Sequence, residues 1–136
     1  MRNLKKEFPI AIVLLMLGYG AAWSQTPKEL AAKSDTPILL LSLLHSSPDC
    51  SNRANAVPVP TISGAPAHGT VQMQIINNNV PASGSCTDRK IPSIGLIYTA
   101  EKQFRGNDTV KIAVAFGNEI RTFVYQIRVE ADGDKP

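Results

Sequence analysis

The fold is decided by TVKIAVAFGNEIRTFVYQIRV, residues 109–129 of the chain. On each side of Gly117-Asn118, apolar residues occupy every second position, which is the period of a strand with one buried face. A Gly-Asn pair between two such segments is typical of a tight β-hairpin. We therefore predict an antiparallel hairpin from 109–116 and 121–129, with these side chains facing the core: Val110, Ile112, Val114, Phe116, Phe123, Tyr125, Ile127 and Val129.

Further strand patterns precede this hairpin. Residues 94–99 and 70–75 read as strands, the latter with Val71, Met73 and Ile75 on one face, and Asn77-Asn78-Asn79 is expected to end it. The prolines in 57–62 restrict that segment to a sheet edge. The apolar run 38–44 favours a strand buried on both faces over a buried helix. Short strands at about 10-residue spacing predict an all-β sandwich.

The segment from Thr26 predicts a different structure. Thr26, Pro27 and Glu29 match the N-cap, N1 and N3 positions of a capping box, and Leu30-Ala31-Ala32 would continue a helix of about two turns. A frayed linker is the alternative. Residues 25–47 are thus expected to form an N-terminal extension, and residues 48–131 the sandwich domain, with a flexible tail at 132–136.

Residues 1–24 have the order of a secretory signal peptide. Arg2, Lys5 and Lys6 precede the apolar run 10–17, and Ala22 and Ser24 are small residues before a cut at Gln25. The rival interpretation is an uncleaved membrane anchor, which needs about 20 apolar residues. Cleavage leaves 112 of the 136 residues, with no second long apolar segment. The mature chain is therefore expected in the periplasm or outside the cell, as a monomer without a membrane span.

The net charge bears on nucleic-acid binding, and the two cysteines bear on disulfide formation. The net charge is +3, but most of the excess lies in the signal segment, so nothing supports nucleic-acid binding. The two cysteines, Cys50 and Cys86, are expected to form one disulfide in an exported chain. A metal pair or a catalytic thiol are the alternatives, and two histidines in the whole chain make a poor zinc set.

Three motifs resemble a known family. Pro66-Ala-His-Gly-Thr-Val71, Ile97-Tyr-Thr-Ala100 and Phe104-Arg-Gly-Asn-Asp-Thr-Val110 are similar to bacterial Ig-like and cadherin-like modules of exported proteins. Such modules often read P-x-H-G-T-V, Y-T-P and F-x-G-x-D-x-F-x-Y-x-V. The resemblance covers about residues 57–130 and implies an immunoglobulin-like antiparallel β-sandwich of the single-copy type. Ala100 replaces the usual Pro, and Val110 and Ile112 replace the usual aromatic pair.

The motif residues also have a physical interpretation. Phe104 is expected to close the bottom of the core, and Gly106 to supply a left-handed turn residue. Asp108 is expected to accept backbone N–H bonds and cap that turn. Tyr98 would bury its ring while its hydroxyl reaches a partner.

Few residues of the sequence are candidates for a catalytic or ligand-binding role. His68 and His45 are each expected to be structural turn or strand-end residues. Asp108 is expected to cap a turn, with calcium binding as the alternative, helped by Asn107 and by Asp88 or Glu101. Arg89-Lys90 and Arg105 are expected to be solvated charge rather than an anion site.

The sequence therefore predicts a non-enzymatic exported module that binds a protein or an envelope glycan, or serves a structural role, without a cofactor. Strand addition at an exposed sheet edge is one mode by which such a sandwich binds a partner. The alternative is a cell-envelope enzyme or accessory factor, with His68 near the loop 86–92. A stalk fragment is a third possibility, which would need neighbouring repeats.

Overall fold

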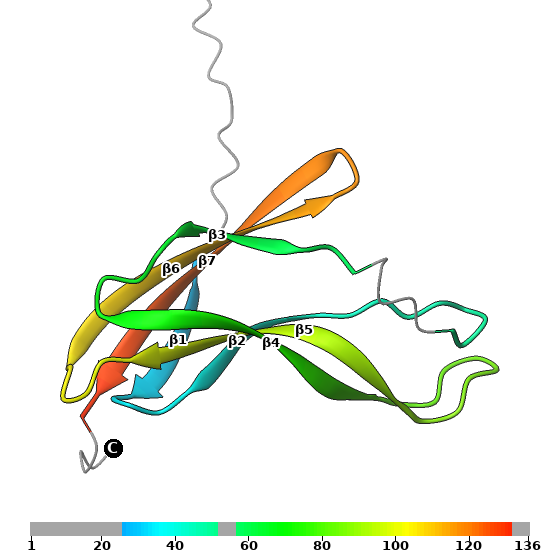
Figure 1. The fold of residues 1–136 in the computed structure, drawn as a ribbon, viewed down its shortest axis with the longest axis horizontal. Helices are drawn as coiled ribbons and strands as arrows, with labels where there is room; N and C mark the ends of the chain where they lie inside the picture. Colours follow the sequence, from blue (N-terminus) through cyan, green and yellow to red (C-terminus); the bar gives the residue numbers. More distant parts are fainter. Residues whose placement is uncertain (1–25, 52–56, 132–136) are drawn as a thin grey trace, which may run out of the picture.

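A computed structural model describes residues 26–51 and 57–131 of the chain. The predicted signal peptide and the tail 132–136 lie outside the described residues. Two sheets face each other as a β-sandwich (Figure 1). In chain order the strands are β1 (Lys28–Lys33), β2 (Ile38–Leu43), β3 (Pro60–Gly64), β4 (Gly69–Val80), β5 (Arg89–Ala100), β6 (Gly106–Phe116) and β7 (Glu119–Glu130).

The predicted C-terminal hairpin is confirmed and forms the centre of the larger sheet. Strands β6 and β7 pair antiparallel from Gly106↔Val129 to Phe116↔Glu119, and Gly117 and Asn118 make the turn. The larger sheet has the order β1-β7-β6-β3, and the smaller has the order β2-β5-β4. Both strands of the hairpin are longer than the sequence pattern indicated, because pairing continues beyond the apolar alternation.

The prediction of a short helix after Thr26 is wrong. Residues Lys28–Lys33 form β1, which pairs in parallel with β7 from Tyr125 to Glu130. In this strand Ala32 is buried, and Leu30 packs against the core. Burial of these alternate side chains outweighs the local capping preference, which is worth only about 1 kcal/mol.

The chain then passes from one sheet to the other within four residues. The Ser34 N–H donates to the Glu130 carbonyl of β7 (2.9 Å), and the Asp35 N–H donates to the Ala100 carbonyl of β5 (3.1 Å). Strands β1 and β2 therefore belong to the two sheets, and the sandwich includes residues that the sequence had suggested as an N-terminal extension.

Strand β2 confirms the strand prediction for the apolar run, with one correction. Leu40 and Leu43 are buried, whereas Leu39 is 49% exposed, so the strand is not buried on both faces. Strand β4 also differs from expectation, because it continues through the three asparagines to Val80. Each of these residues has a partner on β5, and backbone pairing to a neighbouring strand outweighs the turn preference of Asn.

The core lies between the two sheets, where alternate residues of β5, β6 and β7 meet. The inward residues predicted for the hairpin are buried or partly buried, except Phe116, which is 38% exposed. Phe116 is the last residue of β6 and lies opposite Glu119, next to the turn of the hairpin. The side chains below 2% exposure are Tyr98, Ile91, Leu96, Ile112, Ile127, Val110 and Val114, with Val129 at the same limit.

Candidate functional site

The carboxylate of Asp108 lies buried near the start of β6 and accepts four hydrogen bonds. Its Oδ1 accepts from the backbone N–H of Ala67 (2.8 Å) and of Thr109 (3.0 Å). Its Oδ2 accepts from the His68 N–H (3.0 Å) and the Tyr98 hydroxyl (2.8 Å). The side chain therefore joins β6 to the segment before β4 and to β5 of the opposite sheet. We call these groups the Asp108 network.

Tyr98 is the part of this network that crosses the core. Its side chain is fully buried, and burial together with the hydrogen bond to Asp108 raises the pKa of the phenol well above its ordinary value. Gly69 leaves room for the ring, since a Cβ there would lie 2.7 Å from Tyr98 Cε2 and from the Thr99 carbonyl oxygen. The glycine of the His-Gly-Thr motif is thus explained by close approach to the tyrosine.

The turn before β6 runs from Glu101 to Phe104, whose N–H donates to the Glu101 carbonyl (3.2 Å), and its left-handed residue is Gln103 (φ 63°). The expectation that Gly106 supplies this turn residue is therefore wrong, because Gly106 is the first residue of β6. Phe104 packs against the core, and its ring stacks on His68 with centroids 4.2 Å apart. Gly106 has φ +138°, a conformation that residues with a side chain rarely adopt. The four motif residues Tyr98, Phe104, Gly106 and Asp108 therefore lie at one end of the sandwich, around the segment 66–69.

Asp108 accepts backbone N–H bonds as expected, but it binds Ala67 and His68 before β4 and not the turn before β6, and this geometry does not favour calcium. Hydrogen-bond donors surround the carboxylate oxygens, whereas a calcium site requires free oxygen ligands converging on the ion. Asp88 cannot join such a site, because it precedes β5 at the far end of the β4–β5 pair. Within residues 26–51 and 57–131, no group of three or more His, Cys, Asp or Glu residues is placed to hold a metal.

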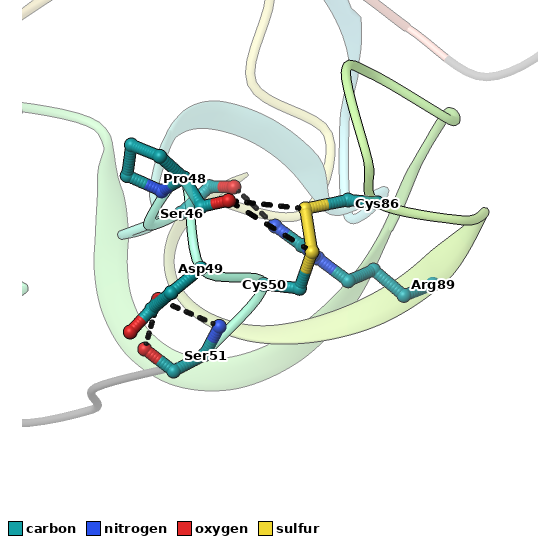
Figure 2. The surroundings of a disulfide bond; sticks show 7 residues. All are labelled: Ser46, Pro48, Asp49, Cys50, Ser51, Cys86 and Arg89. Atoms are coloured by element: carbon teal, nitrogen blue, oxygen red, sulfur yellow. Dashed lines mark hydrogen bonds between the residues drawn. A yellow bond between two sulfur atoms is a disulfide. The ribbon is translucent and has the colours of Figure 1, made fainter.

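The opposite end of the sandwich carries the predicted disulfide, which is confirmed. Cys50 and Cys86 are bonded, with Cα atoms 5.5 Å apart. Figure 2 shows the bond beside Pro48, whose carbonyl lies 3.7 Å from Cys86 Sγ. Asp49 caps the preceding turn by accepting from the Ser51 N–H (3.1 Å) and hydroxyl (2.6 Å), and these bonds lower the pKa of Asp49. The disulfide therefore ties the segment after β2 to the β4–β5 loop.

Arg89 lies beside this disulfide, and its Nη2 donates to the Ser46 hydroxyl (2.6 Å). Its Nε and Nη1 are buried without a hydrogen-bond partner among the described residues. Lys90 is exposed on the next position, and Arg105 lies at the other end of the molecule, before β6. The structure does not bring the three basic residues together.

The two histidines lie apart and in different settings. His45 Nδ1 is 3.5 Å from the Ser47 hydroxyl in the segment after β2. His68 Nδ1 is 3.8 Å from Glu101 Oε2 on the exposed surface. Strand β4 separates His68 from the loop 86–92, a distance of roughly 35 Å at the rise of an extended strand. The expected placement of His68 near that loop is therefore wrong.

Sequence reasoning missed a feature of β4. This strand has 12 residues and forms one edge of the smaller sheet, pairing within the described residues only with β5. Met73 and Ile75 share one face of β4 as predicted, and this is the inner face, yet they are 49% and 82% exposed. Their cross-strand partners are Leu96, which belongs to the core, and Ile94, which packs against it, yet Met73 and Ile75 themselves remain open to solvent. The signal was the absence of any charged residue between Gly69 and Val80.

Comparison with known proteins does not identify a family. No family model and no curated protein matches the chain. A solved structure described as "Solution Structure of Amebosin" is 10% identical, covers 75% of this chain and 88% of that chain, and has a TM-score of 0.45. A similarity of this size assigns neither a family nor a function.

Replacing Asp108 with Ala should lower the free energy of unfolding by about 2–3 kcal/mol, because the Tyr98 hydroxyl loses its partner in the core. Tyr98→Phe removes a single donor and should cost about 1 kcal/mol. Asn107→Ala, a change at the exposed neighbour, should stay within about 0.5 kcal/mol. Urea unfolding of the three variants measures this order, and equal losses for Asp108→Ala and Asn107→Ala would contradict the proposed network.

The double change Cys50→Ser with Cys86→Ser should lower stability by about 2–5 kcal/mol, because the bond closes a long loop in the unfolded chain. The two cysteines are separated by 36 positions. Thermal unfolding with and without reductant measures the effect. Reductant should lower the melting temperature of the natural protein and leave the double variant unchanged, and an identical response of both would be inconsistent with a stabilising bond.

Proposed function

We propose that the chain is an exported, non-enzymatic immunoglobulin-like module that binds another protein by accepting an extended strand at the edge of β4. An envelope glycan is the other ligand class that the sequence suggested. The observation that carries the proposal is the outer edge of β4, which pairs with no further strand among residues 26–51 and 57–131 and carries the exposed side chains of Met73 and Ile75. An added strand gains main-chain hydrogen bonds from such an edge and side-chain contacts at alternate positions.

The strand order supports the immunoglobulin-like assignment. In constant-type immunoglobulin domains, the second, fifth and fourth strands form part of one sheet, and the third, sixth and seventh form the other. Here the smaller sheet is β2-β5-β4, and the larger contains β3, β6 and β7. The first strand pairs with β7 instead of β2, which is a departure from that arrangement.

Two observations support export. The disulfide between Cys50 and Cys86 is of a kind that persists in oxidising compartments. The order of basic, apolar and small residues in 1–24 is that of a cleavable leader. In the part of the chain that the structure describes, no helix has the length and hydropathy needed to cross a membrane.

The motif residues have structural tasks that support a scaffold role. The Asp108 carboxylate and the Tyr98 hydroxyl bond each other inside the fold, and His68 stacks on Phe104. The alternative, an envelope enzyme, would rely on the exposed pair of His68 and Glu101, since this pair places an imidazole beside a carboxylate on the surface. These two functions make opposite predictions for His68.

Selection from a library of displayed unstructured peptides should yield sequences that bind the purified protein saturably. Ile75→Lys should weaken their binding at least tenfold, because it places a charge on the inner face where the added strand packs. Ile120→Lys is the matched control, since Ile120 is 72% exposed on another strand. Calorimetric titration of each variant with one selected peptide measures the difference.

His68→Ala completes that test and should leave peptide binding unchanged. Purified cell-wall sacculi serve as the glycan probe in the same series. If the natural protein and Ile75→Lys bind sacculi equally well, the proposal that the edge of β4 is the binding site is wrong. Hydrolysis of sacculi that disappears with His68→Ala, while the melting temperature stays the same, would establish the enzyme instead.

The intact mass of the protein made from its full coding sequence tests export. The expected mass begins at Gln25, with no thiol label incorporated until reductant is added. A full-length mass would indicate that the leader is retained. Two thiols labelled without reductant would place the chain in a reducing compartment.

A further inference from the structure

Within residues 26–51 and 57–131, the edge strands of the two sheets are β1, β3, β2 and β4. These strands differ in the features that prevent pairing with a further strand. Strand β1 has six residues, including Lys28, Glu29 and Lys33. Strand β3 has five residues, begins at Pro60 and shifts register after Ile62. Strand β2 has six residues and shifts register after Leu39. Charge, proline, short length and bulges are the devices by which proteins block edge-to-edge association.

Strand β4 has none of these devices. Its 12 residues contain no charge and no proline, and they pair with β5 in continuous register from Gly69↔Ala100 to Val80↔Arg89. A long, uncharged edge without bulges accepts another strand readily. Among the described residues, β4 is therefore the edge that is open to pairing.

We propose that the strand received at this edge is β4 of a second copy of the chain, paired antiparallel across a two-fold axis at Gln74. This inference rests on the proposed function, because it names the partner for the same edge. An edge strand can pair only with another strand whose backbone N–H and C=O groups are also available. A second copy of β4 meets this condition, because it is an uncharged edge strand of the same length. No like charges oppose each other in such a pair, whatever its register.

The apolar side chains select the register. Residues directly opposite in antiparallel strands share a face, so inner-face positions must oppose inner-face positions. With Gln74 opposite its own copy, Met73 of each chain lies opposite Ile75 of the other. In the single chain the Met73 side chain is 49% exposed and the Ile75 side chain 82% exposed. In the dimer each of these side chains would be covered by its partner from the other copy. Centring the pair on Ile75 would instead place Met73 opposite Asn77. Centring it on Met73 would place Ile75 opposite Val71, which already packs against the core of its own chain.

The same geometry predicts that association stops at two chains. A pair formed by one surface with its own copy is closed, whereas pairing between two different edges continues into filaments. Because β1, β2 and β3 are blunted, the joined sheet has the order β2-β5-β4-β4-β5-β2 and ends in edges that resist further addition. The expected assembly is therefore a dimer with one continuous sheet.

Opposite charges at the axis provide the test. Gln74 is exposed, so Gln74→Lys and Gln74→Glu should fold normally, and circular dichroism and the melting temperature check this. Each variant places like charges opposite each other and should weaken self-association at least about fivefold. An equimolar mixture should restore the dimer. Thr61→Lys and Thr61→Glu, on the exposed edge strand β3, are the matched controls and should associate like the natural protein.

Sedimentation equilibrium over a concentration series up to the millimolar range measures the dissociation constant of each sample. A dimer that weakens with either Gln74 variant and returns on mixing supports the axis at Gln74. A dimer indifferent to these charges, or a natural protein that stays monomeric at every concentration, overturns the inference. If a monomeric protein still binds selected peptides in a manner sensitive to Ile75→Lys, the second copy is wrong and the edge-binding function stands.

Discussion

The carboxylate of Asp108 is the constraint on which the arrangement of the two sheets depends. Asp108 lies on β6 of the larger sheet. Its carboxylate accepts a hydrogen bond from the Tyr98 hydroxyl of the smaller sheet and from the backbone N–H groups of Ala67 and His68 before β4. A buried carboxylate requires such compensation, because leaving it without hydrogen bonds would cost several kcal/mol. The close packing of Gly69 against Tyr98 follows from bringing these segments to one point.

The sequence was sufficient for the parts of the fold that short-range patterns encode. The alternation around Gly117-Asn118 predicts the β6–β7 hairpin because inward side chains and turn geometry are both local properties. The pairing of Cys50 with Cys86 followed from there being two cysteines in a chain expected to be exported. The sequence also suggested that Asp108 accepts backbone N–H bonds, but it could not say which, since Ala67 lies 41 positions away.

Other features depend on contacts that no local pattern encodes. The segment from Lys28 becomes a strand because β7 offers it an edge, although its capping residues favour a helix. Ile75 has the alternation of a buried residue, yet its side chain is exposed although its partner Ile94 on β5 packs against the core. The open edge of β4 follows from these long-range facts together, since it requires knowing which strand is last in its sheet. The candidate binding surface is therefore less predictable from sequence than the scaffold.

Amide hydrogen exchange at Ala67 and His68, resolved by NMR, tests the role of Asp108 most directly. Both residues are exposed and lie in a bend, so their backbone N–H groups would exchange rapidly without a partner. If the carboxylate holds the fold together, both amides should exchange only through global unfolding, as slowly as Val110 and Ile112 in the core. Exchange at the rate of an open loop would contradict the account, because the two bonds to Asp108 would then break without the fold opening.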